Sequence, residues 1–135
     1  MVDQVTKKII CTAHGRGKSH DFHLFKASKV KLKKDIECLA DKGYQGIQKF
    51  HSLSRTPTKK RRGSDLSTQE KKMNRELAQL RIVGEHVNRK LKVFKILSER
   101  YRNRRRRFGL RFNLIAGLYN YEINLPGSET FGSIL

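Results

Sequence analysis

Acidic residues are scarce in this sequence. It has 12 Asp and Glu against 31 Lys and Arg in 135 residues, which gives a formal net charge of +19. Positive charges in such excess repel one another within a folded chain, and they favour binding to a polyanion. Nucleic acid is the most common partner of such basic proteins. We therefore expect DNA or RNA as a partner.

The sequence also lacks the features of secreted and membrane proteins. Its two cysteines, Cys11 and Cys38, are too few for a disulfide framework and are typical of reduced thiols in a cytosolic protein. No signal-peptide pattern follows Met1, and no apolar run approaches the roughly 18 residues of a membrane span. We expect one cytoplasmic domain of ordinary size, with no membrane partner. Ser/His/Asp triads, P-loops and dinucleotide fingerprints are absent.

The pattern of apolar and turn-forming residues predicts an α/β domain. A Ser67–Glu70 capping box predicts the start of a long basic helix that continues to about Tyr101, with an apolar stripe on one face. The other elements are strands over 5–13 and 35–41, a short strand ending near Pro57, a short helix over 21–28, a helical turn over 47–51 and a closing helix over 110–123.

Glu85 is an isolated acid in the basic stretch "LRIVGEHVNRKLK". In a helix, Arg81, Glu85, Arg89 and Lys92 share one face. One interpretation is a ladder of ion pairs on a solvated surface. The other is a carboxylate that binds a metal ion beside cations that contact phosphates.

Asp41 is the strongest single candidate for chemistry. It ends the strand expected over 35–41 and precedes the glycine-containing turn "KGYQG". Ligand sites in α/β sheets form at such strand ends, although Asp also often simply begins a turn. Together, Asp41 and Glu85 could converge on a divalent cation, Mg²⁺ or Mn²⁺, because Mg²⁺ prefers hard oxygen ligands and often uses one or two carboxylates.

The densest charge run, "RNRRRRFGLRF", adds Arg104, Arg105, Arg106 and Arg107 to the DNA-binding candidates Arg81, Arg89 and Lys92. Contacts from these cations to phosphates are salt-dependent and independent of DNA sequence. Cys11, His14, His20 and His23 have a spacing that could bind zinc, but it does not fit the usual finger patterns.

Three motifs occur in an order that resembles a known family. They are "LADKGYQG", "TPTKK" and "NRELAQLRIVGEHVNRKLKVFKILSERYRNRR", and with "GRGKSHDFHLFKAS" they resemble the second half of a DDE-type insertion-sequence transposase. In that family the second catalytic Asp stands in a "DKGY"-like motif, matched by Asp41. The catalytic Glu stands in a helix with the pattern Tyr-x2-Arg-x3-Glu-x6-Lys, which Arg81, Glu85 and Lys92 match. Ala78 replaces the Tyr.

The resemblance implies an RNase H-like catalytic domain over 1–122, followed by a flexible tail over 123–135. It also implies metal-dependent cleavage and strand transfer of DNA, at the element ends and the target, with oligomers in the intact enzyme. The family's first catalytic Asp has no match here. We therefore expect a C-terminal portion with a mixed sheet lacking its first strands, which is inactive alone and completed by the upstream half of the transposase.

An alternative from another class fits the charge equally well. A non-enzymatic basic protein that coats nucleic acid would also carry +19. Such a protein has no need of Asp41 at a strand end or of Glu85 within the basic helix, so the two carboxylates discriminate between the alternatives.

Overall fold

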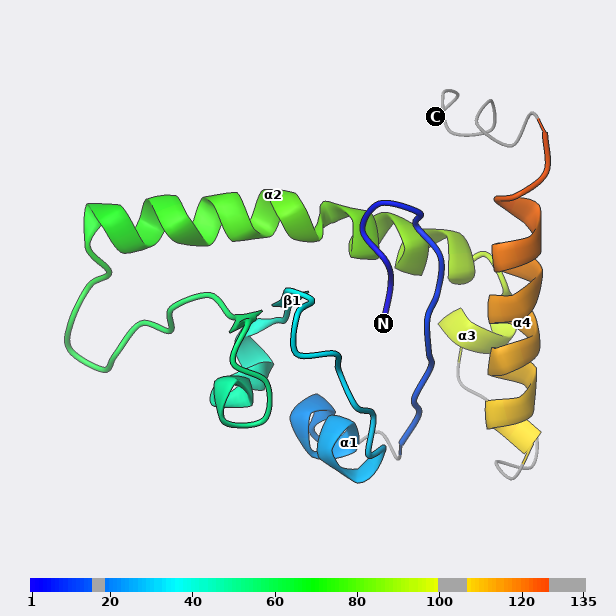
Figure 1. Ribbon diagram of the computed structural model, residues 1–135, viewed down its shortest axis with the longest axis horizontal. Coiled ribbons are helices and arrows are strands. Elements are labelled where there is room, and N and C mark those ends of the chain that lie inside the picture. Colours follow the sequence, from blue (N-terminus) through cyan, green and yellow to red (C-terminus); the bar gives the residue numbers. More distant parts are fainter. Residues whose placement is uncertain (16–18, 100–106, 127–135) are drawn as a thin grey trace. The chain divides into compact units, whose positions relative to one another are not determined.

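A computed structural model describes residues 1–15, 19–99 and 107–126 (Figure 1). The chain divides into two compact units, one formed by Met1–Thr12 with Val83–Leu135 and the other by Ala13–Ile82. Helix α2, Thr68–Leu91, contributes residues to both units. None of the helices in the described ranges combines the length and apolar composition that crossing a membrane requires.

The unit formed by Ala13–Ile82 contains a small parallel sheet. Strand β1 (Cys38–Leu39) pairs with β2 (Ser54–Arg55), with Cys38 opposite Ser54 and Leu39 opposite Arg55. Helix α1 (Asp21–Ala27), the 3₁₀ helices η1 (Lys42–Tyr44) and η2 (Ile47–Lys49), and the first part of α2 complete this unit. The combination of helices with a parallel strand pair is that of an α/β fold, as the sequence predicts.

His51 joins the segment that precedes β1 to β2. Its ring is buried, with Nδ1 2.9 Å from Ser54 Oγ and Nε2 2.9 Å from the Lys33 carbonyl oxygen. Ile47, at 1% exposure, lies one turn before it. Two hydrogen bonds to a buried ring fix the chain that enters β1 to the chain that forms β2.

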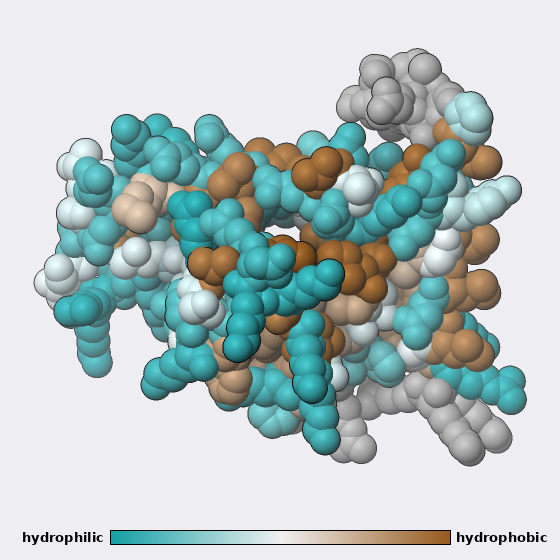
Figure 2. Space-filling view, in the orientation of Figure 1, coloured by the Kyte–Doolittle hydropathy of each residue, from teal (hydrophilic) through white to brown (hydrophobic). Residues whose placement is uncertain are grey.

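The unit formed by Met1–Thr12 and Val83–Leu135 has an apolar core. Its buried members come from the N-terminal segment, from the end of α2 and from α4 (Phe108–Glu122); they are Ile9, Val87, Leu91, Ile115, Ala116 and Tyr119. The opposite side of α4 carries exposed apolar residues, which gather over this helix in Figure 2; they are Leu110, Leu114, Leu118 and Tyr121.

The strand predicted over 5–13 is wrong. The structure has a turn there, with Lys7 at φ 60°, and a single antiparallel bridge between Val2 and Ile9. The Asn120 side chain takes the place of a neighbouring strand: Ile9 N–H donates to Asn120 Oδ1 at 2.7 Å, and Asn120 Nδ2 donates to the Ile9 carbonyl at 2.8 Å. The strand predicted over 35–41 is shorter than expected, because its ladder with β2 extends only over Cys38–Leu39.

The long helix also ends earlier than Tyr101. Helix α2 stops at Leu91, Phe94 is extended with φ −74° and ψ 110°, and a separate short helix, α3, follows at Lys95–Ser98. The break lets Ile96 and Leu97 of α3 pack against the core that contains Leu91. If α2 continued as a straight helix, it would carry Ile96 and Leu97 away from the core that contains Leu91.

The predicted capping box is confirmed. Ser67 N–H donates to Glu70 Oε2 at 2.8 Å, and Glu70 N–H donates to Ser67 Oγ at 3.2 Å. These bonds satisfy two backbone donors that a helix leaves without partners at its start. The Ser67 N–H and hydroxyl also lower the pKa of the Glu70 carboxyl, with a smaller contribution from the charge of Arg61.

Replacing Ser67 with Ala is expected to lower the free energy of unfolding by about 1 kcal/mol at pH 7, because it removes the N-cap acceptor. Urea unfolding followed by circular dichroism measures this loss. Since the folded pKa of Glu70 lies below 4.5, the contribution of its carboxylate is present above pH 4.5 and is lost as the pH falls through the folded pKa. Ser52→Ala, at an exposed turn residue, is the control; an equal loss in both variants contradicts the prediction.

Candidate functional site

The end of β1 fixes the position of Asp41. Ala40 is buried, and its N–H donates to the Arg55 carbonyl at 2.9 Å, so a backbone hydrogen bond to β2 holds the residue before Asp41. Asp41 then caps η1: its Oδ1 accepts from Lys42 N–H at 2.6 Å. Gly46, at φ 86°, ends the turn in a conformation that glycine adopts without strain. Asp41 therefore lies close to where the sequence predicts it, two residues after the end of β1.

Arg81 of α2 binds Asp41. Its Nη1 lies 3.2 Å from Asp41 Oδ1, with the Arg81 side chain 25% exposed and the Asp41 side chain 58% exposed. Both contacts of the carboxylate to described residues fall on Oδ1, which leaves Oδ2 for a further ligand. Arg81 thus supplies a fixed positive charge beside this acid.

The Tyr44 ring lies close enough to Asp41 to sense its charge. Burial raises the pKa of the Tyr44 hydroxyl, and the negative charges of Asp21 and Asp41 raise it further. Tyr44 also packs against Phe22 and Phe25 of α1, at ring-centroid distances of 5.8 and 6.2 Å. These contacts hold η1, and with it the turn after Asp41, against α1.

Glu85 lies one helical turn after Arg81 on α2 and is exposed. Along the described length of α2, no ion pair joins Glu85 to Arg81 or Arg89, so the ladder of ion pairs is not formed. Asp41 belongs to one unit and Glu85 to the other. Their exposed carboxylates are hard oxygen donors, which suit Mg²⁺ or Mn²⁺. Within the described ranges, no three His, Cys, Asp or Glu residues form a group that could hold a metal.

The predicted phosphate-binding cations have different surroundings. Arg89 is exposed on α2, and Arg107 is exposed immediately before α4. Lys92 is exposed just after the end of α2, although its N–H still donates to the Asn88 carbonyl at 3.1 Å. Arg104, Arg105 and Arg106 lie outside the described residues. Among the described cations of this set, Arg81 differs from Arg89, Lys92 and Arg107 because a carboxylate already binds it.

The four residues whose spacing could bind zinc are divided between the two units. Cys11 belongs to one unit, whereas His14, His20 and His23 belong to the other. His20 caps α1, with Nδ1 accepting from the Phe22 N–H at 3.4 Å. Both cysteines are free thiols, and burial raises the pKa of Cys38. Cys38 therefore stays a protonated thiol at neutral pH.

One group of cations lines a pocket and is not among the site residues predicted from the sequence. Segment 56–62, which contains four consecutive cations from Lys59 to Arg62, lines an open pocket together with Gln45 and Gln48. The run "TPTKKRR" is the sequence signal that could have identified it. Its pairing with two glutamines depends on the turn after Asp41 and could not be read from the run itself.

A double-mutant cycle tests the Arg81–Asp41 contact. Arg81→Met and Asp41→Asn, singly and together, are expected to show a coupling energy of about 0.2–1 kcal/mol in urea unfolding, the usual range for partly exposed pairs. Asn keeps an oxygen that can accept from Lys42 N–H, so the cycle isolates the charge. Arg75→Met, which changes an exposed arginine of the same helix, provides the control cycle. Equal coupling in the two cycles contradicts the contact.

Comparison with known proteins agrees with the resemblance in the motifs. A family model described as "DDE superfamily endonuclease" matches residues 1–120. The chain is 60% identical over 125 residues to the "Probable transposase for insertion sequence element IS702" of Microchaete diplosiphon. That match covers 93% of this chain and 45% of the relative, so the chain spans less than half the relative's length. No solved structure matches. The chain belongs to the DDE superfamily of endonucleases.

Proposed function

We propose that this chain is part of the catalytic domain of a DDE-type transposase and acts in DNA transposition. Family membership over residues 1–120 and the transposase relative support this proposal. In it, residues 1–122 are a portion of an RNase H-like fold whose mixed sheet is completed by strands from elsewhere in the intact enzyme. Residues 123–135 form a tail, of which 127–135 lie outside the described residues.

The contact between Arg81 and Asp41 carries the proposal. An acid at the end of a parallel strand, with one oxygen held by a backbone N–H and a guanidinium, is oriented for a further ligand. In the proposed site Asp41 and Glu85 ligate Mg²⁺ or Mn²⁺. The motif resemblance, in which Asp41 and Glu85 match catalytic acids of the family, supports this pair of ligands.

The proposed reaction has two phosphoryl-transfer steps. Water attacks a phosphodiester at an element end and frees a 3′ hydroxyl, and that hydroxyl then attacks a phosphodiester of the target DNA. A bound divalent metal would supply activation of the attacking oxygen and stabilisation of the leaving oxygen. Arg81 keeps the Asp41 carboxylate in place through its ion pair, while Lys92 and Arg89 neutralise nearby phosphates.

Two acids are fewer than the family uses. We propose that a third catalytic acid comes from the upstream half of the transposase, which would make that half a partner of this chain. Oligomers belong to the intact enzyme in this proposal, and the site of action is the cytoplasm, at the nucleoid. The 135-residue chain by itself is then a DNA-binding and metal-binding part that does not cut DNA.

The runner-up is a basic nucleic-acid-binding protein without enzymatic activity. The net charge of +19 supports it as well as it supports the transposase. A protein of that kind would keep its function when the charge of Asp41 or Glu85 is removed. Metal binding therefore separates the two functions.

Asp41→Asn and Glu85→Gln are each expected to weaken Mn²⁺ binding at least tenfold. Loss of a residue that only hydrogen-bonds to a metal ligand typically costs roughly tenfold in metal affinity, and loss of the ligand itself costs no less. Electron paramagnetic resonance of free Mn²⁺ measures the dissociation constant. The chain is expected to leave supercoiled plasmid intact in the same Mn²⁺ buffer.

Glu76→Gln is the matched control, since it neutralises another exposed acid of α2. The control variant should bind Mn²⁺ as the unchanged protein does. Equal binding by all four proteins would support the runner-up. Plasmid nicking that is abolished in Glu85→Ala would show that the chain needs no third acid.

Replacing Arg104, Arg105, Arg106 and Arg107 with Ala is expected to weaken duplex binding and to reduce its salt dependence, by about 0.9 in the logarithmic slope for each phosphate that is no longer neutralised. Fluorescence anisotropy over a NaCl series measures both effects. The control replaces four exposed lysines, Lys31, Lys33, Lys34 and Lys49, and removes the same charge. A slope that is unchanged in the arginine variant contradicts this role.

A further inference from the structure

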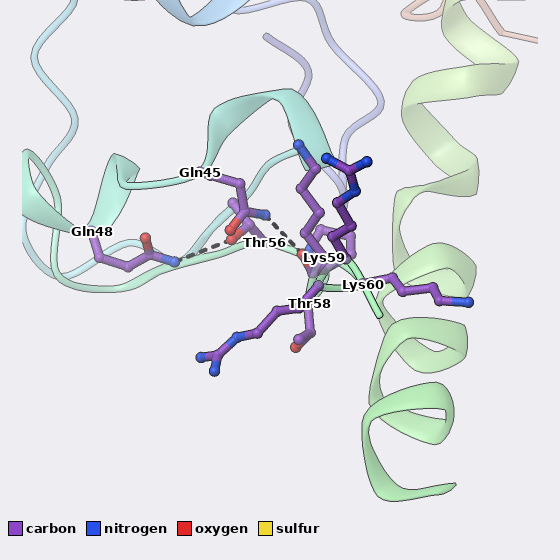
Figure 3. A pocket seen from close by; sticks show the side chains of 9 residues that line it. Gln45, Gln48, Thr56, Thr58, Lys59 and Lys60 are labelled. Atoms are coloured by element: carbon purple, nitrogen blue, oxygen red, sulfur yellow. Dashed lines mark hydrogen bonds between the residues drawn. The ribbon is translucent and has the colours of Figure 1, made fainter. Parts of the chain in front are cut away.

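The pocket beside the turn after Asp41 is open and polar. It has a volume of about 660 Å³, and Gln45, Gln48 and segment 56–62 line it (Figure 3). All of these residues belong to the unit formed by Ala13–Ile82. In Figure 3 the Gln48 amide points toward Thr56, and a dashed line marks its hydrogen bond to the Thr56 hydroxyl at 3.3 Å.

Hydrogen bonds hold the backbone from which the cations extend. Gln45 Nε2 donates to the Pro57 carbonyl at 2.8 Å, and Pro57 is buried. Asn74 of α2 binds both backbone groups of Thr58: its Oδ1 accepts from Thr58 N–H at 2.8 Å, and its Nδ2 donates to the Thr58 carbonyl at 3.0 Å. The start of the basic run is therefore fixed to η1 on one side and to α2 on the other.

The four cations are only partly neutralised by the protein. Lys60 Nζ lies 2.5 Å from Asp65 Oδ1, and Arg61 lies close enough to Glu70 to lower the pKa of its carboxyl. No ion pair joins Lys59 or Arg62 to a carboxylate anywhere in residues 1–15, 19–99 and 107–126. Two cations beside amide and hydroxyl groups provide charge and hydrogen bonds for phosphate oxygens.

The pocket is next to the candidate catalytic acid. Asp41 caps η1 and Gln45 ends it. At about 2 Å of rise per residue in a 3₁₀ helix, these two positions are separated by about 8 Å along its axis. Since phosphates of one DNA strand follow one another at about 3.4 Å along the duplex axis, this separation corresponds to a few nucleotides.

We propose that this pocket binds a backbone phosphate of DNA, through Lys59 and Arg62, within a few nucleotides of the phosphate presented to Asp41. The inference rests on the proposed function, which supplies DNA as the substrate. It adds a phosphate site distinct from the α2 cations and from the run that contains Arg107. Such a site fixes the register of the strand at the acid without reading its sequence.

Lys59→Gln with Arg62→Gln in the full chain tests the site. Binding to a fluorescein-labelled duplex of about 30 base pairs is measured by anisotropy over a NaCl series in EDTA. We expect weaker binding and a logarithmic salt slope reduced by about 0.9, because one phosphate is no longer neutralised. Each single variant should show about half that reduction, and circular dichroism checks that every variant is folded.

Lys31→Gln with Lys34→Gln is the control, since it removes two exposed charges from the same unit. An unchanged slope in the pocket variant, or an equal reduction in both variants, overturns the site. If the unchanged protein does not bind the duplex, the DNA partner of the proposed function fails as well. Because EDTA removes divalent metal, the result is independent of whether Asp41 and Glu85 bind Mn²⁺.

Discussion

The shortage of carboxylates is the constraint on which this structure depends. Because only 12 acids accompany 31 cations, the positive charges repel one another, and each acid that forms an ion pair lowers that repulsion locally. Two of the three ion pairs among the described residues join segments that are distant in sequence: Glu37, just before β1, binds Arg55 of β2 at 3.0 Å, and Asp41 binds Arg81 at 3.2 Å. Exposed pairs of this kind contribute little free energy each. Stability must therefore come mainly from the two small packed regions, around Ile47 and around Leu91.

What the sequence could predict was local. The Ser67–Glu70 capping box depends on residues three apart, and its geometry is the one expected. Closing helix α4 was likewise predicted to within a few residues. The strand predicted over 5–13 failed because an extended segment needs a partner, and the partner of Ile9 is the side chain of Asn120, 111 residues away. No local pattern encodes that pairing.

The same distinction applies to the candidate site. Asp41 was placed correctly because a strand followed by a glycine-containing turn is a local signal. The partner of Arg81 was not predicted. The spacing by four on α2 indicates an ion pair with Glu85, whereas the fold of Ala13–Ile82 brings Asp41 to the guanidinium. An i,i+4 pair is worth only about 0.3–0.5 kcal/mol, so a tertiary contact readily replaces it. The roles of Asp41 and Glu85 as metal ligands stay predictions.

Two kinds of surroundings can be contrasted among the cations of the unit formed by Ala13–Ile82. Arg81, three-quarters covered and bound to Asp41, orients an acid and has little surface left for DNA. Lys59 and Arg62 extend from backbone held by Asn74 and Gln45, and among the described residues no carboxylate binds them. A guanidinium that holds a carboxylate should act on the acid's position, whereas an unpaired cation on a fixed backbone should act on a phosphate. A single excess of positive charge can thus serve two purposes, and the fold, not the composition, determines which cation serves each.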